Sequence, residues 1–439
     1  MGKEIDTGSL SAYLKDLSSV ANAPYLWEPA RRKVLGLLVD LEKKRSPDVE
    51  WEVIGDEDAL YLRLSKGRAH DRYLITCHLD HPYLVFDGLG KAWPFGNFDY
   101  DRLDPDGTIP VEVWDKDGSR LGESVLMRKG ERRCFTVASG TGGGRNDQAT
   151  YKMPAFEVRE GVVEMSNADD MAMVALSLSL IDSISKSDAN FDAVFAFENV
   201  EEVKQLSGVG IALKRKTPWW MIGPDTNLIV LEMVDEKLPP KPLQAREQLN
   251  LPRPKVGGGP GLRVNDRELI YGQKSGYPNY LEARFLAVAR AVDLEHQYTV
   301  QAGFCDGGIF SGFNLGPNIV GLTVVDNYRH NEGEAGLFVP EKFHLRDLEL
   351  AGRWIYEVIC GKDVTSDKDF DYKSLLSQRL RATSLLASDS YLQGLVRERV
   401  RTYRAMKPRL EMGKYFPDSL SEWVKFVSAV AFAYMRTFL

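Results

Sequence analysis

The 439-residue sequence predicts an α/β fold, with helices on both faces of a mixed β-sheet. The first observation is a set of short runs that are apolar throughout, a property of strands buried on both faces of a sheet. The second is that helical patterns of apolar residues lie between these runs. The third is a Gly- and Asp-rich stretch of short β-like runs that interrupts the alternation. Together they predict a three-layer α/β/α sandwich with an inserted small all-β domain.

The elements of the sandwich follow the period of the apolar residues along the chain. Residues 8–46 are expected to be helical, because apolar residues such as Leu10, Leu14 and Leu17 recur at helical spacing. Four apolar runs are expected to form strands: 72–79, 191–197, 228–234 and 318–326. Four further helical patterns lie at 170–185, 206–214, 279–293 and 343–360. Strand and helix therefore alternate over most of the chain.

The domain organisation follows from where this alternation stops. Between the first two strands lie the β-like runs IPVEVWD, SVLMRKG and RRCFTVA, separated by turn signals. We therefore expect residues 1–84 and 161–362 to form the α/β domain and 85–160 to form the inserted β domain. Residues 363–439 are expected to form a C-terminal helical extension. The GTGGGR run at 140–145 and the GGGPG run at 257–261 lack the context of nucleotide-binding loops and are interpreted as ordinary loops.

The composition is that of a globular enzyme and restricts its partners. A net charge of -7 argues against nucleic acid or an anionic membrane as the main partner. The four cysteines are scattered, which predicts neither a zinc knuckle nor a disulfide framework. The sequence shows no secretory h-region and no uncharged apolar run long enough to span a membrane. We expect a cytoplasmic protein.

Candidate site residues begin with a histidine at the end of the first apolar run. His78 and Asp80 are two residues apart and can point to the same side, whereas His81 points the other way. A carboxylate next to a metal-binding imidazole fixes its tautomer and raises its basicity. The alternative interpretation is a surface histidine near a strand end.

Two acidic pairs follow at element boundaries. Asp169 and Asp170 stand before a helix, where acidic residues ordinarily serve as caps. Glu201 and Glu202 stand after a buried strand, where such residues ordinarily lie in a solvated loop. The carboxyl ends of strands are also where α/β proteins bind ligands, so both pairs remain site candidates.

Glu232 is the least ordinary carboxylate in the sequence. It lies inside the apolar run LIVLEMV, where an unpaired carboxylate would cost several kcal/mol to bury. No Lys or Arg is next to it in that run, so a metal ion would provide the partner it needs. Asp235, at the end of the same run, is an alternative ligand. His330 follows the last apolar run and is the second candidate imidazole.

The order of these motifs resembles that of the tetrahedral and glutamyl aminopeptidases, a family of di-metal peptidases. The resemblance covers about residues 10–360 and includes the inserted β domain, the GGGPG run and the segment GFCDGG at 303–308. It implies the sandwich fold of the zinc peptidases and two divalent metal ions, Zn²⁺ or else Co²⁺ or Mn²⁺. The implied metal ligands are His78, Asp169, Glu202, Glu232 and His330.

The resemblance also implies the roles of the other residues. Asp169 would bridge the two metals, Glu201 would be the general base, and Asp80 would orient His78. Asp306 matches an acid that lies near the site in the family. Two departures are Glu232, where the family usually has Asp, and Asn331, where it usually has Ser.

The function implied is that of a metal-dependent aminopeptidase that removes N-terminal residues from short peptides. Relatives assemble into large hollow oligomers through the inserted β domain, which implies a homo-oligomer. One alternative is a metal-dependent deacylase or carboxypeptidase-like amidohydrolase, and another is a non-catalytic binding protein on the same fold. A glycosidase using Glu201 and Glu202 is disfavoured, because adjacent carboxylates rarely straddle a sugar bond at the required separation.

Overall fold

The chain is described by a computed structural model. The residues it describes are 6–96, 107–128, 134–153, 156–203, 205–213, 226–237, 253–263, 280–299, 305–313, 318–333, 337–361, 397, 399–404 and 406–407. The predicted C-terminal extension, 363–439, lies outside these residues except for 397, 399–404 and 406–407, which are helical. None of the described helices is both long and apolar enough to cross a membrane.

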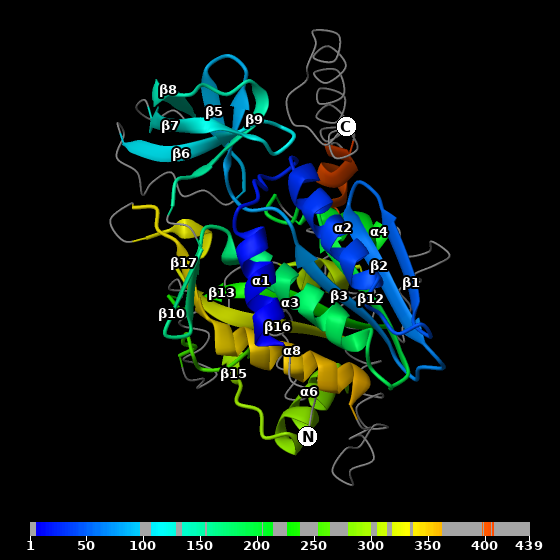
Figure 1. Cartoon of the computed structure of the whole chain (residues 1–439). Coiled ribbons are helices and arrows are strands. Elements are labelled where there is room, and N and C mark those ends of the chain that lie inside the picture. The colour runs from blue at the N-terminus through cyan, green and yellow to red at the C-terminus, as the bar shows by residue number, and fades with distance from the viewer. Residues whose placement is uncertain are drawn as a thin grey trace.

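An eleven-stranded mixed sheet forms the centre of the molecule (Figure 1). Its four central strands are parallel to one another, in the order β12, β3, β13 and β16. They span Phe191–Glu198, Arg72–His78, Thr226–Asp235 and Asn318–Asn327. These are the four apolar runs predicted to be strands, and the prediction of a mixed sheet is confirmed.

Shorter strands complete the sheet on both sides. On one side β2 pairs antiparallel with β12 and β1 pairs antiparallel with β2. On the other side the order continues through β17, β11 and β10, while β14 pairs with β16 and β15 pairs with β14. These strands are β1 Glu50–Gly55, β2 Ala59–Lys66, β10 Glu157–Arg159, β11 Val162–Met165, β14 Gly261–Arg263, β15 Gln297–Thr299 and β17 Glu341–His344.

Helices cover both faces of this sheet, as the apolar strands require. In β3, Tyr73 and Ile75 point into one apolar core while Leu74, between them, points into the other. The first core is closed by α1, α2, α3, α6 and α8, which span Thr7–Leu17, Glu28–Glu42, Ala168–Ile184, Tyr280–Ala291 and Leu345–Cys360.

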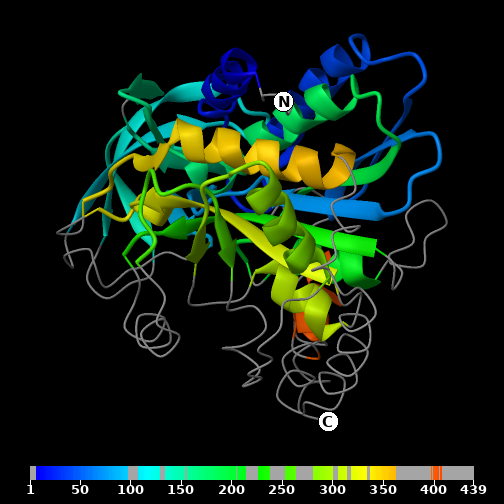
Figure 2. The ribbon, with the colours of Figure 1, turned by 90° about the horizontal axis from the view of Figure 1, so that it is seen from below.

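The second core is closed by α4, Leu206–Leu213, and α7, Asp306–Gly312, with Tyr403 packed beside them. Figure 2 shows α8 on one face of the sheet and the helical residues 399–404 on the other. The three-layer sandwich is therefore confirmed. The segment 8–46, which the sequence predicts to be helical, consists of two helices, α1 and α2, with an irregular stretch between them.

The inserted β domain is a closed barrel beside the sandwich (Figure 1). Alternate residues of its strand β6, namely Ile109, Val111 and Val113, are buried in the barrel core. The GTGGGR run connects two of its strands, with Gly140 ending β8 and Arg145 beginning β9. The barrel order is β4-β5-β8-β7-β6-β9, and these strands span Leu84–Asp87, Lys91–Pro94, Phe135–Gly140, Arg120–Arg128, Thr108–Trp114 and Arg145–Tyr151. The boundaries 85–160, 161–362 and 363–439 stay predictions.

The parallel strands bring the candidate residues to one edge of the sheet. His78 is the last residue of β3 and lies in register with Glu198, the last residue of β12. The strands β13 and β16 end together at Asp235 and Asp326. Every acidic pair and histidine that the sequence singles out therefore lies within or just beyond the carboxyl ends of these strands, or on α3.

Candidate metal centre

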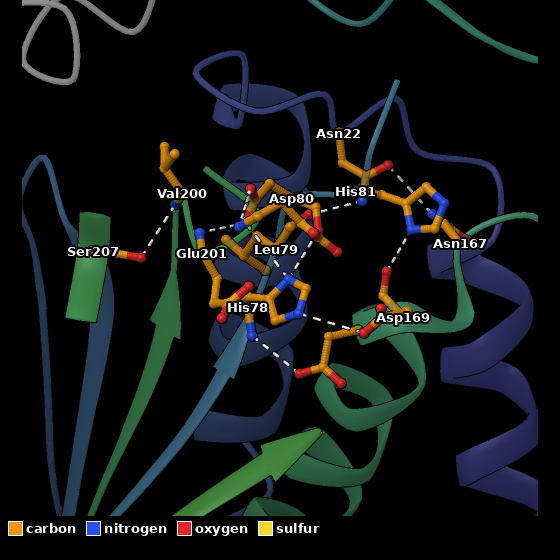
Figure 3. Close-up of polar contacts among 12 residues, drawn as sticks. Asn22, His78, Leu79, Asp80, His81, Asn167, Asp169, Val200, Glu201 and Ser207 are labelled. Atoms are coloured by element: carbon orange, nitrogen blue, oxygen red, sulfur yellow. Dashed lines mark hydrogen bonds and ion pairs between the residues drawn. The ribbon is translucent and has the colours of Figure 1, made fainter. Parts of the chain in front are cut away.

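Asp80 ties the histidine at the end of β3 to the loop after β12. Its two carboxylate oxygens accept hydrogen bonds from the backbone amides of Glu201 at 2.9 Å and Glu202 at 3.1 Å. His78 Nδ1 lies 2.9 Å from the carbonyl oxygen of Asp80 and 3.5 Å from its Oδ1 (Figure 3). Because a carbonyl can only accept, Nδ1 carries the proton and Nε2 keeps the lone pair that a metal would use. The alternative of a surface histidine is wrong, since His78 is 2% exposed.

Asp169 lies between the two candidate imidazoles. Its Oδ1 is 3.5 Å from His78 Nε2, and its Oδ2 is 3.1 Å from His330 Nε2. Asp169 and Asp170 have non-helical dihedral angles at the start of α3, and the peptide bond between them is cis. The alternative of a capping residue is therefore wrong for Asp169, whose carboxylate is turned towards the imidazoles. Asp170 instead accepts a hydrogen bond from the backbone amide of His78 at 3.1 Å.

The two glutamates after β12 are buried. Glu202 Oε1 lies 3.0 Å from His330 Nε2, and His78, Asp169 and Glu202 each present a ligand atom within 4.8 Å of the other two. Both Glu201 and Glu202 are 4% exposed, so the alternative of a solvated loop is wrong.

Glu232 faces the site from the middle strand. Its Oε1 lies 3.8 Å from His78 Nε2. Asp235, three residues further along β13, accepts a hydrogen bond from the backbone amide of Lys237 at 2.7 Å. Since residues three apart on a strand point to opposite sides, Glu232 is the ligand candidate of the two.

Several buried atoms at this edge make no hydrogen bond among the described residues. Those that belong to the candidate ligands are His78 Nε2, Asp169 Oδ1, Glu202 Oε1 and Oε2, and His330 Nε2. A buried polar group left in this state costs about 1–3 kcal/mol. Imidazole nitrogens and carboxylate oxygens are the donors that Zn²⁺ takes, and Co²⁺ and Mn²⁺ accept similar sets. The residues therefore fit a divalent cation.

The surroundings shift the pKa values of Glu201 and Glu202 in opposite directions. Burial raises the pKa of Glu201 well above its ordinary value, and the charges of Glu232 and Asp306 raise it further. Burial would also raise the pKa of Glu202, but His330 offsets it and the pKa is lowered. Carboxyl groups with separated pKa values are a mark of divided acid–base roles.

At Asp169, as at Glu202, burial raises the pKa and nearby positive charge lowers it, and here the positive charge has the larger effect. Burial alone would raise its pKa, but Arg329, His330 and His78 hold it well below its ordinary value. Asp169 is therefore an anion, the form in which a carboxylate binds a cation.

Two supporting residues were not found from the sequence. Glu341, in β17, accepts hydrogen bonds from the backbone amides of His330 at 2.7 Å and Asp169 at 3.0 Å. His81 lies between the carbonyl oxygen of Asp169, 2.5 Å from its Nδ1, and Asn331 Oδ1, 3.0 Å from its Nε2. Glu341 falls in a short strand without a distinctive pattern, and nothing in the sequence marks it. The second histidine of His78-Leu79-Asp80-His81 was the one signal available for His81.

A third residue, Arg329, is a partner of Glu232 that the sequence did not indicate. The run LIVLEMV has no Lys or Arg next to Glu232, yet Arg329 Nη2 lies 2.8 Å from its Oε1. The same guanidinium places Nε 2.6 Å from Asp169 Oδ2. The run itself could not reveal this partner, because Arg329 follows β16, the strand next to β13, and approaches Glu232 from there.

Asp306 lies near the candidate site, where its charge raises the pKa of Glu201. It begins α7 beside Glu198, and burial together with Glu198 raises its pKa well above its ordinary value. The contact with α4 is close, since a Cβ added to Gly208 would lie 1.9 Å from Asp306 Oδ1.

Comparison with known proteins gives a result at the level of structure. No family model matches the chain, and no curated protein matches its sequence. The TET1 peptidase of Pyrococcus horikoshii superposes with a TM-score of 0.58 at 18% identity, covering 80% of this chain and 99% of that one. A TET aminopeptidase from a marine-sediment thaumarchaeote gives 0.59 at 16% identity, covering 84% and 99%. An aminopeptidase from Desulfurococcus kamchatkensis gives 0.57 at 15% identity, covering 82% and 98%.

These similarities extend over nearly the whole of each neighbour. They confirm at the level of fold the resemblance that the order of the motifs indicates. This chain has the fold of the tetrahedral aminopeptidases.

Proposed function

We propose that the chain is a metal-dependent aminopeptidase that removes N-terminal residues from short peptides. The observation that carries this proposal is the carboxylate of Asp169, which faces the imidazoles of His78 and His330 from its two oxygens. Glu202 and Glu232 lie beside these imidazoles, at the sheet edge where α/β proteins bind ligands. Aminopeptidase rather than another amide chemistry is supported by the neighbours of the same fold.

The proposed ligands form two groups that share Asp169. His78 and Glu232 belong to one metal position, and Glu202 and His330 to the other. Zn²⁺ suits this set of nitrogen and oxygen donors, as do Co²⁺ and Mn²⁺. A bound divalent ion would lower the pKa of water and polarise the carbonyl of the scissile amide.

Glu201 is the proposed general base. It precedes the ligand Glu202, it is buried, and its pKa is raised by burial and by the charges of Glu232 and Asp306. A carboxylate with a raised pKa can take a proton from water and return it to the leaving amine. Asp80 is a positioning residue, since its hydrogen bonds fix the amides of Glu201 and Glu202 relative to His78.

We propose that the chain forms a homo-oligomer. The TET1 peptidase of Pyrococcus horikoshii can assemble into a tetrahedron or a large octahedral shell, and this chain shares its fold. Closed assemblies of identical chains are also the usual form of soluble oligomers.

The proposal is tested with two substrate classes and one variant. Aminoacyl anilides are compared with N-acyl amino acids as substrates, with Zn²⁺, Co²⁺ or Mn²⁺ added to metal-free protein. We expect metal-dependent cleavage of the anilides. Glu201→Gln should lower kcat by about 10²–10⁴-fold, because it removes the base and leaves the ligands. The amount of metal bound by Glu201→Gln, measured by elemental mass spectrometry, should equal the amount bound by the unchanged protein.

Glu52→Gln, which alters an exposed glutamate on β1, is the matched control and should leave activity unchanged. Preference for N-acyl amino acids would establish the deacylase alternative. Metal binding without turnover of either substrate class would establish the non-catalytic alternative.

A further inference from the structure

Arg329 introduces a fixed positive charge at one of the two proposed metal positions. Its Nε lies 2.6 Å from Asp169 Oδ2 and its Nη2 lies 2.8 Å from Glu232 Oε1. The Arg329 side chain is 17% exposed, while those of Asp169 and Glu232 are 0% and 3% exposed. The guanidinium therefore spans two buried carboxylates, which is the place a bridging cation would take.

The backbone around Arg329 is shaped for this contact. Tyr328 before it and His330 after it are both left-handed, with φ of 69° and 58°. On an extended strand two successive side chains point to opposite sides. Here Arg329 Nε and His330 Nε2 both reach Asp169 Oδ2, at 2.6 and 3.1 Å. Non-glycine residues held in this region are uncommon and concentrate at functional sites.

The two metal positions are consequently unequal. Among the five proposed ligands, the buried atoms without a hydrogen bond in the described part of the chain belong to His78, Asp169, Glu202 and His330. Glu232 is not one of them, because Arg329 is its partner. The group of donors that lies within 4.8 Å of one another is His78, Asp169 and Glu202, again without Glu232. The guanidinium is thus already the partner of Glu232, whereas Glu202 and both imidazoles keep ligand atoms without a hydrogen bond.

We infer that Arg329 competes with the second metal ion for Glu232. One divalent ion binds tightly through Glu202, His330 and the shared Asp169. A second, beside His78, binds only by displacing the guanidinium from Glu232. The reason is electrostatic: an arginine keeps its charge in proteins, and a divalent ion beside it in a buried site is repelled. The inference rests on the proposed metal-dependent function and concerns how that site is filled.

The experiment titrates metal-free full-length protein with Zn²⁺ by calorimetry and measures the bound metal after dialysis. The unchanged protein should bind one Zn²⁺ tightly and a second at least about tenfold more weakly, a difference of roughly 1.4 kcal/mol. Arg329→Gln should strengthen the second binding step by about tenfold or more and leave the first within a few-fold. Arg346→Gln, which removes an exposed arginine paired with Glu295, is the matched control and should change neither step.

A second variant keeps the inference testable if Arg329→Gln fails to fold. Glu232→Gln should retain the first Zn²⁺ and lose the second. Two equally tight ions in the unchanged protein, or a second step that Arg329→Gln does not strengthen, would overturn the inference. Absence of any bound Zn²⁺ would instead overturn the proposed function. One tight ion without peptide hydrolysis would support the inference and contradict the proposed activity.

Discussion

At the scale of single residues, the protein buries more carboxyl groups near the sheet edge than the metal ligands alone require. Glu198, the last residue of β12, is 0% exposed and lies beside Asp306. Burial raises the pKa of Glu198 to about 8, although Asp306 and Ser207 each act to lower it. The carboxyl is therefore neutral in the folded protein at neutral pH, while in the unfolded chain it is ionised.

This difference predicts a pH-dependent stability. Because the folded pKa of Glu198 lies above the unfolded value of 4.5, its contribution is fully present below pH 4.5. It is lost as the pH rises towards about 8, and it levels off above that. Glu198→Gln keeps the neutral shape and removes the titration. Relative to the unchanged protein, the variant should therefore gain a few kcal/mol of unfolding free energy between pH 5 and pH 8.

The measurement is urea unfolding of metal-free protein at a series of pH values. Glu52→Gln, on an exposed position, serves as the control. A difference between Glu198→Gln and the unchanged protein that does not vary with pH would show that Glu198 is ionised in the fold.

At the scale of elements, the GGGPG run has a structural partner. The backbone amides of Gly257 and Gly259 donate to the two carboxylate oxygens of Asp347, in the first turn of α8, at 2.7 and 3.0 Å. Both glycines have positive φ, 79° and 84°. A Cβ on Gly259 would also lie 2.6 Å from the carbonyl oxygen of Glu295. The run is a loop tied to a helix, and its amides are already used by a carboxylate.

Loss of this tie should destabilise the fold. Asp347 is 1% exposed, so Asp347→Ala leaves two amides without their acceptor. We expect the free energy of unfolding to fall by about 2–6 kcal/mol, at about 1–3 kcal/mol for each of the two amides. Asp347→Asn keeps one acceptor oxygen and should cost about half as much. Equal unfolding midpoints in denaturant for all three proteins would contradict the assignment.

At the scale of the whole molecule, the barrel exposes apolar side chains that suit contact with another copy. Leu89 is 77% exposed in the turn between β4 and β5, and Leu121 is 46% exposed on β7. Isolated exposed leucines are ordinary on protein surfaces, but two on one small barrel fit the proposed homo-oligomer.

The mass of the protein in solution tests the proposed homo-oligomer. Light scattering of the full chain should give a mass several times 49.4 kDa. Leu89→Asp with Leu121→Asp should lower that mass, because buried charges oppose association. Val39→Asp, at a 46% exposed position on α2, is the matched control. A mass of one chain for the unchanged protein would contradict the proposed assembly.

The sequence alone was sufficient for much of the fold. β3, β12, β13 and β16 were predictable because a strand covered on both faces must be apolar along its length. The helices between them were predictable because their buried faces repeat at the helical period. Both signals are local, since each depends only on which side of an element meets a core.

The candidate site was predictable only in part, because order along the chain does not fix distance in space. His78, Asp169, Glu202, Glu232 and His330 were marked by burial or by strand ends, together with the resemblance to the aminopeptidases. Their convergence on Asp169 depends on the strand order of the sheet.

The sequence by itself determined the layers of this protein and the acids and imidazoles available to its site. Only the tertiary structure decided that Arg329 reaches Glu232, 97 residues before it, and that Glu341 holds Asp169, 172 residues away. Apolar patterning depends only on residues that are close in the sequence. These contacts instead require strands β13, β16 and β17 to lie side by side, and they require a left-handed backbone at Tyr328 and His330.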